Sequence, residues 1–230
     1  MKRLVVLPLL LIGSQLTFAA DSTLKTDLSK ESYSIGYDFG KNISSRLSDI
    51  EMKTFITGFE DAFQEKTAKM SQDDMTAAMQ AYRQKMTVKQ QAERAEKSEG
   101  NKKVSTEFLA ANKKQKGVVT LDSGMQYTIL ADGTGKQPTA KDTVTVHYRG
   151  TLINGEEFDS SYRRKEPATF PVSGVIKGWT EALQLMKEGG KWQLFVPPEL
   201  AYGEAGAGGS IGPNELLIFE VELISVKSGS

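Results

Sequence analysis

The chain has 230 residues, of which 39% are hydrophobic and 25% are charged, and its 29 basic side chains balance its 29 acidic ones. The length favours two domains of ordinary globular composition, and the charge balance argues against a nucleic-acid binder, which usually carries a basic surplus. Cysteine is absent, which excludes disulfides and thiol chemistry, and a catalytic triad or polyhistidine metal site would have to be built from the single histidine, His147.

The first twenty residues have the pattern of a secretory signal peptide. Lys2 and Arg3 precede an apolar stretch over residues 4–12, and the segment 17–20 (Thr-Phe-Ala-Ala) offers small residues for cleavage. The apolar stretch is shorter than the roughly 20 residues that a membrane-spanning helix needs. We therefore expect residues 1–20 to be a signal peptide and the mature protein to be exported. A retained membrane anchor is the alternative.

Residues 21–70 are predicted to form two short amphipathic helices. Apolar side chains recur every fourth residue from Ile35 to Leu47, and a second apolar set spans residues 52–63. Gly36 and Gly40 lie beside the first stripe and would let another helix approach closely. Two short helices cannot bury such stripes alone. A second copy of the chain is the natural partner, although folding back on the other domain would also cover them.

Residues 71–116 are predicted to form a long connecting helix. Ser71 and Asp74 have the spacing of a capping box at its start, and an apolar face continues over its first turns. Between residues 90 and 103 this face is lost among charged and polar side chains, which predicts a solvated spacer. Gly100 marks a possible weak point in this stretch.

Strand patterns begin at Val118 and continue to Val226, with alternating apolar residues in several runs. Asn154-Gly155 is a strong signal for a two-residue hairpin. Helical spacing returns only between residues 176 and 186. One short helix against a twisted antiparallel sheet is an α+β domain, which we place at residues 117–230. His147 alternates with inward-facing neighbours and is expected on the surface.

Several motifs in this half come in an order and spacing that closely resemble the FKBP family. They cover Val146–Gly150, Gly155–Ser161, Gly174–Trp179, Leu200–Gly203 and Leu217–Leu223. The resemblance extends over residues 117–227 and implies an FKBP fold with peptidyl-prolyl cis–trans isomerase activity. It implies no cofactor or metal. The implied substrates are proline-containing unfolded or partly folded proteins, and the implied inhibitors are macrolides of the FK506 and rapamycin type.

The amino-terminal half adds a second resemblance. Residues 33–42 and 108–112, together with 179–186 in the other half, look like the macrophage infectivity potentiator group of bacterial FKBPs. This implies a homodimer joined through its amino-terminal helices, with a catalytic domain on each arm and chaperone-like holding of clients. It also implies a periplasmic location, with possible peripheral association with the outer membrane.

The resemblance assigns roles to eleven positions. The catalytic set is Tyr148, Phe158, Asp159, Tyr202 and Phe219. The substrate-binding set is Arg164, Phe170, Val175, Ile176, Trp179 and Ile211. Trp179 would form the floor of a proline pocket, Ile176 would offer its backbone N–H to a ligand carbonyl, and Arg164 would pair with Asp159. Ala168, Ala207 and Ser210 stand where the family often has larger or polar residues, which leaves substrate preference and inhibitor affinity open.

Such a pocket needs neither a nucleophile nor a metal. Rotation of an X–Pro bond crosses a barrier of about 18–20 kcal/mol that is set by amide resonance. The twisted amide is less polar than the planar one, so an apolar wall stabilises it relative to the ground state. A non-catalytic binding module and a peripheral outer-membrane structural protein are the competing functions. The first would suppress aggregation without accelerating isomerisation, and the second would be separated by cell fractionation.

Overall fold

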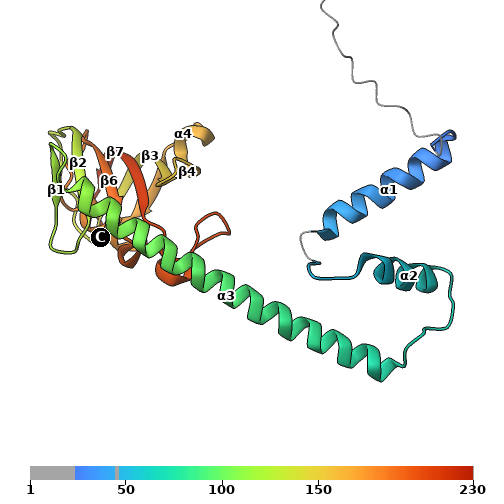
Figure 1. Ribbon diagram of the computed structural model, residues 1–230. Helices are drawn as coiled ribbons and strands as arrows, with labels where there is room; N and C mark the ends of the chain where they lie inside the picture. The colour runs from blue at the N-terminus through green and yellow to red at the C-terminus, as the bar shows by residue number, and fades with distance from the viewer. Residues whose placement is uncertain (1–23, 45–46, 230) are drawn as a thin grey trace, which may run out of the picture. The chain divides into compact units, whose positions relative to one another are not determined.

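The computed structural model describes residues 24–44 and 47–229, and the chain falls into two compact units, Met1–Met75 and Thr76–Ser230. The predicted fold class is confirmed: amino-terminal helices and a long helix precede an antiparallel-sheet domain (Figure 1). The predicted signal peptide lies outside the described residues. Among helices formed by residues 24–44 and 47–229, none combines the length and apolarity needed to cross a membrane.

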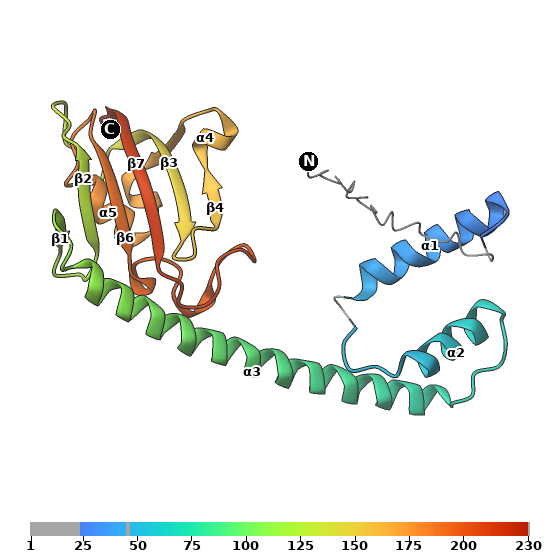
Figure 2. The ribbon, with the colours of Figure 1, turned by 45° about the horizontal axis from the view of Figure 1, so that its top comes forward.

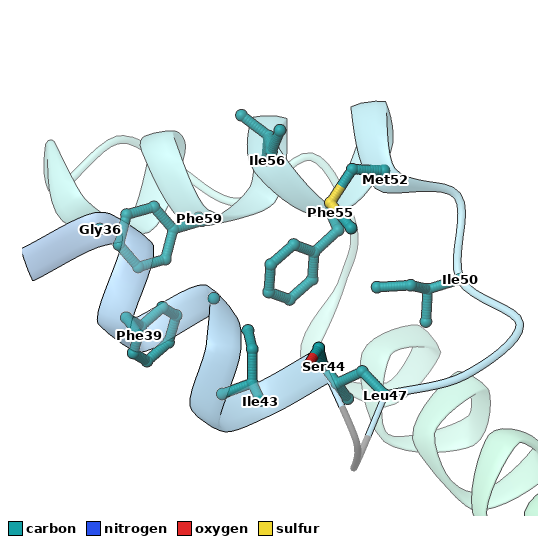
Figure 3. A pocket seen from close by; sticks show the side chains of 11 residues that line it. Gly36, Phe39, Ile43, Ser44, Leu47, Ile50, Met52, Phe55, Ile56 and Phe59 are labelled. Carbon is teal, nitrogen blue, oxygen red and sulfur yellow. The ribbon is translucent and has the colours of Figure 1, made fainter. Parts of the chain in front are cut away.

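The first unit contains helices α1 (Asp27–Ser44) and α2 (Met52–Phe63), as the spacing of apolar residues predicted. Neither helix has a buried residue, and part of the apolar side chains of each helix instead line a groove of about 340 Å³ (Figure 3). The rings of Phe39 and Phe59 meet across it at a centroid distance of 5.9 Å. The lining residues are Gly36, Phe39, Gly40, Ile43, Ser44, Leu47, Ile50, Met52, Phe55, Ile56 and Phe59.

Helix α3 (Gln72–Asn112) is continuous over 41 residues and begins at the predicted capping box. The backbone N–H of Asp74 donates to Ser71 Oγ at 3.1 Å, and the Ser71 hydroxyl donates to the Asp74 carboxylate at 2.7 Å. These bonds satisfy one of the N–H groups that a helix start leaves without an intrahelical partner. The helix runs through Gly100 without interruption.

The second unit is built on one antiparallel sheet. Its strands run in the order β1-β2-β6-β7-β3-β4, with β5 also paired to β3 (Figures 1 and 2). The strands are β1 (Val118–Thr120), β2 (Gln126–Ala131), β3 (Thr143–Leu152), β4 (Glu157–Ser160), β5 (Ala168–Pro171), β6 (Lys191–Val196) and β7 (Leu217–Lys227). The helices of this part are α4 (Ser161–Arg164) and α5 (Lys177–Leu183), with short 3₁₀ turns η1 (Val172–Gly174), η2 (Pro198–Leu200) and η3 (Gly203–Ala205).

The core lies between the sheet and α5. Along β3 every second residue is buried, from Val144 to Leu152, and α5 places Trp179 and Leu183 against the same face. His147 points to the opposite face, as predicted. Its ring is half-buried there because the Tyr162 ring stacks on it at 4.7 Å.

The predicted hairpin joins β3 to β4, but its loop is longer than two residues. The Gly155 N–H donates to the Leu152 carbonyl at 3.0 Å, and the register shifts between Gly150 and Thr151. A two-residue type I′ turn needs a positive φ at both central residues. Among the described residues Gly155 has one, at 85°, and Asn154 does not.

Within the second unit, the second half of α3 packs on the sheet and its loops, which we call the sheet unit. The prediction of a solvated spacer is therefore wrong from Arg94 onward. The polar side chains of Arg94 and Asn101 donate to backbone carbonyls between residues 204 and 213. Farther along, the Phe108 ring contacts Phe195 at a centroid distance of 5.8 Å. Figures 1 and 2 both show this end of α3 beside the sheet. Polar residues here serve as contacts to backbone, a use that a hydrophobic pattern does not register.

Candidate active site

A hollow of about 540 Å³ opens in the sheet unit, where the ends of several elements converge. Strands β3, β4, β5 and β7 supply one part of its wall, and α5 with the segments before it and after η2 supplies the rest. The lining residues are Tyr148, Phe158, Asp159, Phe170, Gly174, Val175, Ile176, Trp179, Ala201, Tyr202 and Phe219. Most of them are aromatic or aliphatic.

Strand pairing places the aromatic side chains at the hollow. Phe219 lies opposite Gly150 in the β3–β7 register, and Tyr148 lies two residues before Gly150 on the same face of β3. Glycine is needed at position 150, because a Cβ there would lie 2.6 Å from Phe158 Cζ and 2.9 Å from Phe219 Cε1. The missing side chain thus lets two rings close over the strand.

Trp179 is the centre of the aromatic wall. Its ring meets Tyr148 and Phe219 edge to face, each at a centroid distance of 5.2 Å, and Phe170 at 6.1 Å. Edge-to-face pairs place positive ring edges against negative ring faces, which fixes ring orientation beyond simple burial. Trp179 is only 4% exposed, and within the described residues its Nε1 has no hydrogen-bond partner. The floor of the hollow is therefore rigid and poor in polar contacts.

Asp159 is the hub of a small polar network at the rim. Its carboxylate accepts from the Tyr148 hydroxyl at 2.5 Å, from Arg164 Nη1, and from the Ser160 backbone N–H at 2.8 Å. Arg164 Nη2 also donates to the Tyr148 hydroxyl at 2.8 Å. The three side chains of Asp159, Tyr148 and Arg164 thus bond to each other in a closed triangle, which holds the Tyr148 ring in one orientation.

The network sets the protonation of both rim groups. Burial is the largest influence on the Asp159 carboxyl and raises its pKa, but hydrogen bonds from Tyr148 and Arg164 and the positive charge of Arg164 outweigh it. The pKa of Asp159 is therefore below its ordinary value. The pKa of Tyr148 is raised, mainly by burial and secondly by the hydrogen bond to Asp159. At neutral pH the rim consists of a carboxylate and a protonated phenol.

The remaining wall comes from segments that flank short helices. Val175 and Ile176 precede α5, and Ile176 is its N-cap, so that the Ile176 N–H has no acceptor within the helix. Tyr202 lies between η2 and η3 and is 41% exposed at the edge of the hollow. A ligand in the hollow would meet apolar groups on the floor and hydrogen-bonding groups only at the edge.

The structure brings nine of the predicted residues to the hollow, namely Tyr148, Phe158, Asp159, Phe170, Val175, Ile176, Trp179, Tyr202 and Phe219. Two lie outside its lining. Arg164 stands behind Asp159 as its ion-pair partner. Ile211 is buried in the apolar cluster, where it exchanges two backbone hydrogen bonds with Ala207. Its side chain is therefore core rather than wall.

The sequence prediction missed two lining residues, Gly174 and Ala201. Both lie inside motifs that had been singled out, next to Val175 and Tyr202. Small residues give no hydrophobic signal of their own, so only their neighbours could have indicated them. Within residues 24–44 and 47–229, no group of three or more His, Asp or Glu side chains is arranged to hold a metal ion.

Comparison with known proteins agrees with this geometry. Residues 134–224 match the family model of the FKBP-type peptidyl-prolyl cis-trans isomerases, and residues 28–129 match that of the domain amino terminal to this isomerase. The chain belongs to the FKBP-type peptidyl-prolyl isomerases. The resemblance that the motifs indicated is thereby confirmed for both halves of the chain, and the chain is a peptidyl-prolyl cis–trans isomerase.

Individual relatives cover nearly the whole chain. The peptidyl-prolyl cis-trans isomerase Mip of Coxiella burnetii is 48% identical over 99% of both chains. The outer membrane protein MIP of Legionella longbeachae is 47% identical over 92% of this chain and 91% of its own. Among solved structures, the crystal structure of FkpA from Escherichia coli covers 90% of this chain and 99% of that chain, with 39% identity and a TM-score of 0.74. The match thus includes the helical half as well as the sheet unit.

Proposed function

We propose that this isomerase binds the proline of its substrate in the aromatic hollow and accelerates folding of exported proteins. The observation that supports this most is the floor made by Trp179, whose ring is fixed edge to face by Tyr148 and Phe219 below an opening of about 540 Å³. A proline ring is small and apolar and suits such a space. The polar residues lie at the edge, where the peptide backbone on either side of proline would pass.

The proposed mechanism is differential stabilisation of the twisted amide. Loss of resonance makes the amide less polar, so replacing water by aromatic walls destabilises the planar ground state more than the transition state. The substrate carbonyl before proline would turn toward the rim formed by Asp159 and Tyr148. The Ile176 N–H and the Tyr202 hydroxyl would bind neighbouring carbonyls. No bond is made or broken in the substrate.

An isomerase assay tests these roles. A chromogenic peptide with one X–Pro bond is mixed with a protease that cleaves only the trans form, and the full-length protein should accelerate the slow phase. Tyr202→Ala should lower kcat/KM, because it removes one edge of the hollow. Tyr162→Ala is the matched control, since Tyr162 is 39% exposed and lies outside the lining. Equal effects of the two substitutions would contradict the proposed site.

The amino-terminal helices are proposed to join two copies of the chain. In the single chain neither α1 nor α2 buries a residue, and Phe39, Ile56 and Phe59 are each 47% exposed beside the groove. A continuous apolar surface of this kind marks an interaction site. The same groove in a second copy offers a matching apolar surface, and Gly36 and Gly40 leave open space for close approach of a helix.

Light scattering on the full chain tests the dimer. Wild type should have the mass of two chains, and Phe59→Glu should shift it to one, because a charge in an apolar interface is costly. Val119→Glu is the control, since Val119 is also exposed but lies on β1. A monomeric wild type, or an unchanged mass for Phe59→Glu, would contradict the proposal.

The proposed organisation follows from these roles. Residues 1–20 would be a signal peptide, 21–70 the dimerisation domain, 71–116 the connecting helix and 117–230 the isomerase domain. The proposed location is the periplasm, with peripheral association with the outer membrane, in keeping with the name of the relative from Legionella longbeachae. Release by osmotic shock, with a mature chain that starts after residue 20, is the expected result. Retention in the cytoplasm would contradict it.

The dimer is further proposed to hold unfolded clients, and FK506- or rapamycin-type macrolides are proposed to block the hollow. Clients would meet two isomerase domains at once, which raises the effective concentration of the second site. Suppression of aggregation of a denatured protein should then depend on the dimer, so Phe59→Glu should weaken it while peptide isomerisation persists. Aggregation suppression without any isomerisation would favour a non-catalytic binding module instead. A saturating macrolide should abolish peptide isomerisation.

A further inference from the structure

The loop that follows Tyr202 is a closed unit. At its base the Gly203 carbonyl accepts from the Asn214 N–H at 2.8 Å, and in its middle Ala207 and Ile211 exchange backbone bonds of 2.9 and 3.0 Å. Ile211 is buried in the same apolar cluster as the floor of the hollow. These backbone bonds tie residues 203–214 into one unit. Its first residue adjoins a residue that lines the hollow.

One arginine of helix α3 forms hydrogen bonds to the start of this loop. Arg94 Nη2 donates to the carbonyls of Glu204 and Ala205, at 2.8 and 2.9 Å. These are the last two carbonyls of η3, which has no next turn to satisfy them. The two bonded carbonyls belong to the second and third residues after Tyr202.

Other residues of the same helix form hydrogen bonds to the end of the loop. Asn214 has a left-handed backbone with φ of 53°, and its side-chain Nδ2 donates to Ser98 Oγ at 2.8 Å. Its carbonyl accepts from the Ser105 hydroxyl at 3.2 Å, and Asn101 donates to the preceding carbonyl at 2.8 Å. Asparagine tolerates the left-handed region better than other side chains, but an outside contact is needed to hold it there. With Arg94, these residues are spaced at i, i+4, i+7 and i+11, which places them on one face of the helix.

From these contacts we infer that Arg94 is a positioning residue for the isomerase reaction. By donating to the last two carbonyls of η3, Arg94 fixes the start of the loop and so fixes Tyr202 at the edge of the hollow. Helix α3 is then part of the substrate-binding apparatus as well as a connector. The inference rests on the proposed role of Tyr202, since Arg94 itself does not line the hollow. Without the arginine the loop would visit other positions, and the fraction of molecules ready to bind substrate would fall.

A population effect of this kind has a specific kinetic signature. The apparent dissociation constant equals the intrinsic one divided by the fraction of competent molecules, so it rises as that fraction falls, whereas the saturated enzyme turns over as before. Arg94→Ala should therefore raise KM for the X–Pro peptide about three- to tenfold, with kcat nearly unchanged, because the two hydrogen bonds of Arg94 are exposed to solvent and their loss costs no more than that of an ordinary hydrogen bond. Arg94→Lys, which keeps one cationic donor, should restore part of the loss. Lys103→Ala is the control: it removes one charge from the opposite face of α3, where Lys103 is exposed and 4.0 Å from Glu107.

A double-mutant cycle decides whether Arg94 acts through Tyr202. In the Tyr202→Ala background, Arg94→Ala should add little to the loss, and the thermal unfolding midpoint of each variant shows that all are folded. If Tyr202→Ala lowers kcat/KM but Arg94→Ala leaves it within the error of the Lys103→Ala control, only the inference fails. Fully additive losses would overturn it as well. If Tyr202→Ala has no effect, the proposed role of Tyr202 fails and the inference fails with it.

Discussion

Replacement of Asp159 by asparagine tests the polar rim most sharply. The carboxylate is the common acceptor for the Tyr148 hydroxyl at 2.5 Å, for Arg164 Nη1 and for the Ser160 N–H. An asparagine of the same size has one acceptor oxygen and an NH₂ group that faces the donors of Arg164. The triangle of side chains must therefore open, and the orientation of the Tyr148 ring is no longer fixed.

The magnitude follows from the exposure of each contact. The bond from Tyr148 goes to a charged acceptor and is partly buried, which places it at about 1.5–3 kcal/mol. The ion pair with Arg164 is 47% and 41% exposed on its two sides, so it adds less than about 1 kcal/mol. Since the asparagine oxygen keeps one acceptor, we expect a net loss of about 1.5–2 kcal/mol, or roughly a 10- to 30-fold fall in kcat/KM.

The assay is the protease-coupled isomerisation of the X–Pro peptide, with thermal unfolding measured on the same samples. Glu157→Gln is the matched control. Glu157 lies on the same strand as Asp159, and its carboxylate pairs with Arg149 at 2.8 Å and with Arg163 at 3.3 Å, away from the hollow. The reasoning is refuted if Asp159→Asn keeps the activity of wild type, or if the control loses as much as Asp159→Asn.

The direction of the Asp159 pKa shift adds a pH dependence to the same experiment. Because the folded-state pKa is depressed, the carboxylate contributes to the rim at every pH above its ordinary value of 3.8 and is lost only as the pH falls through the lower, folded value. The raised pKa of Tyr148 keeps its phenol protonated beyond pH 10. We expect kcat/KM of wild type to be flat from mildly acidic to mildly alkaline pH. A loss of activity centred between pH 5 and 7 would contradict the assignment.

Three further predictions concern stability and packing. Backbone N–H groups, first that of Thr139, donate to the Asp142 carboxylate and lower its pKa to about 2, so the carboxylate stabilises the fold fully above its ordinary pKa and loses this effect as the pH falls toward 2. Asp142→Asn should therefore lower the urea midpoint at pH 7 and make that midpoint change less on acidification. A midpoint that responds to acid as in wild type would refute the prediction. Gly150→Ala should cost about 1–3 kcal/mol of stability and lower kcat/KM, because its Cβ would lie 2.6 Å from Phe158 Cζ; wild-type activity would refute it. Gly100→Ala, which meets nothing within 4 Å in an unbroken helix, should instead raise the free energy of unfolding by about 0.5–1 kcal/mol, and a destabilised variant would show that residue 100 needs glycine.

The residues of the hollow could be predicted because they stand in motifs with fixed spacing. Tyr148 and Phe219 come from alternating strand positions, and Trp179 from a short helical pattern, so that local periodicity and the family resemblance point to the same face. Ile211 was predicted to bind substrate but lies outside the lining of the hollow. It belongs to a glycine-rich loop, where no periodicity indicates which side chains turn inward. Its backbone pairing with Ala207 directs it into the core.

The contact between α3 and the 203–214 loop was beyond sequence reasoning for a different reason. Arg94, Ser98 and Asn101 look like the solvated face of a spacer helix, because hydropathy treats a polar side chain that bonds a backbone carbonyl like one that bonds water. Their partners lie more than a hundred residues away in the chain. Only the folded arrangement, with the exposed carbonyls of η3 facing α3, gives these side chains a structural role.

Catalysis by rotation in an apolar hollow, without proton transfer, is tested most directly by exchange spectroscopy. The cis–trans interconversion of an X–Pro peptide is measured at equilibrium by NMR, with and without the full-length protein, in H₂O and in D₂O. We predict that the protein accelerates the exchange and that the acceleration is the same in both solvents, since no bond to hydrogen changes in the rate-limiting step. No acceleration, or an acceleration that falls markedly in D₂O, would contradict the mechanism.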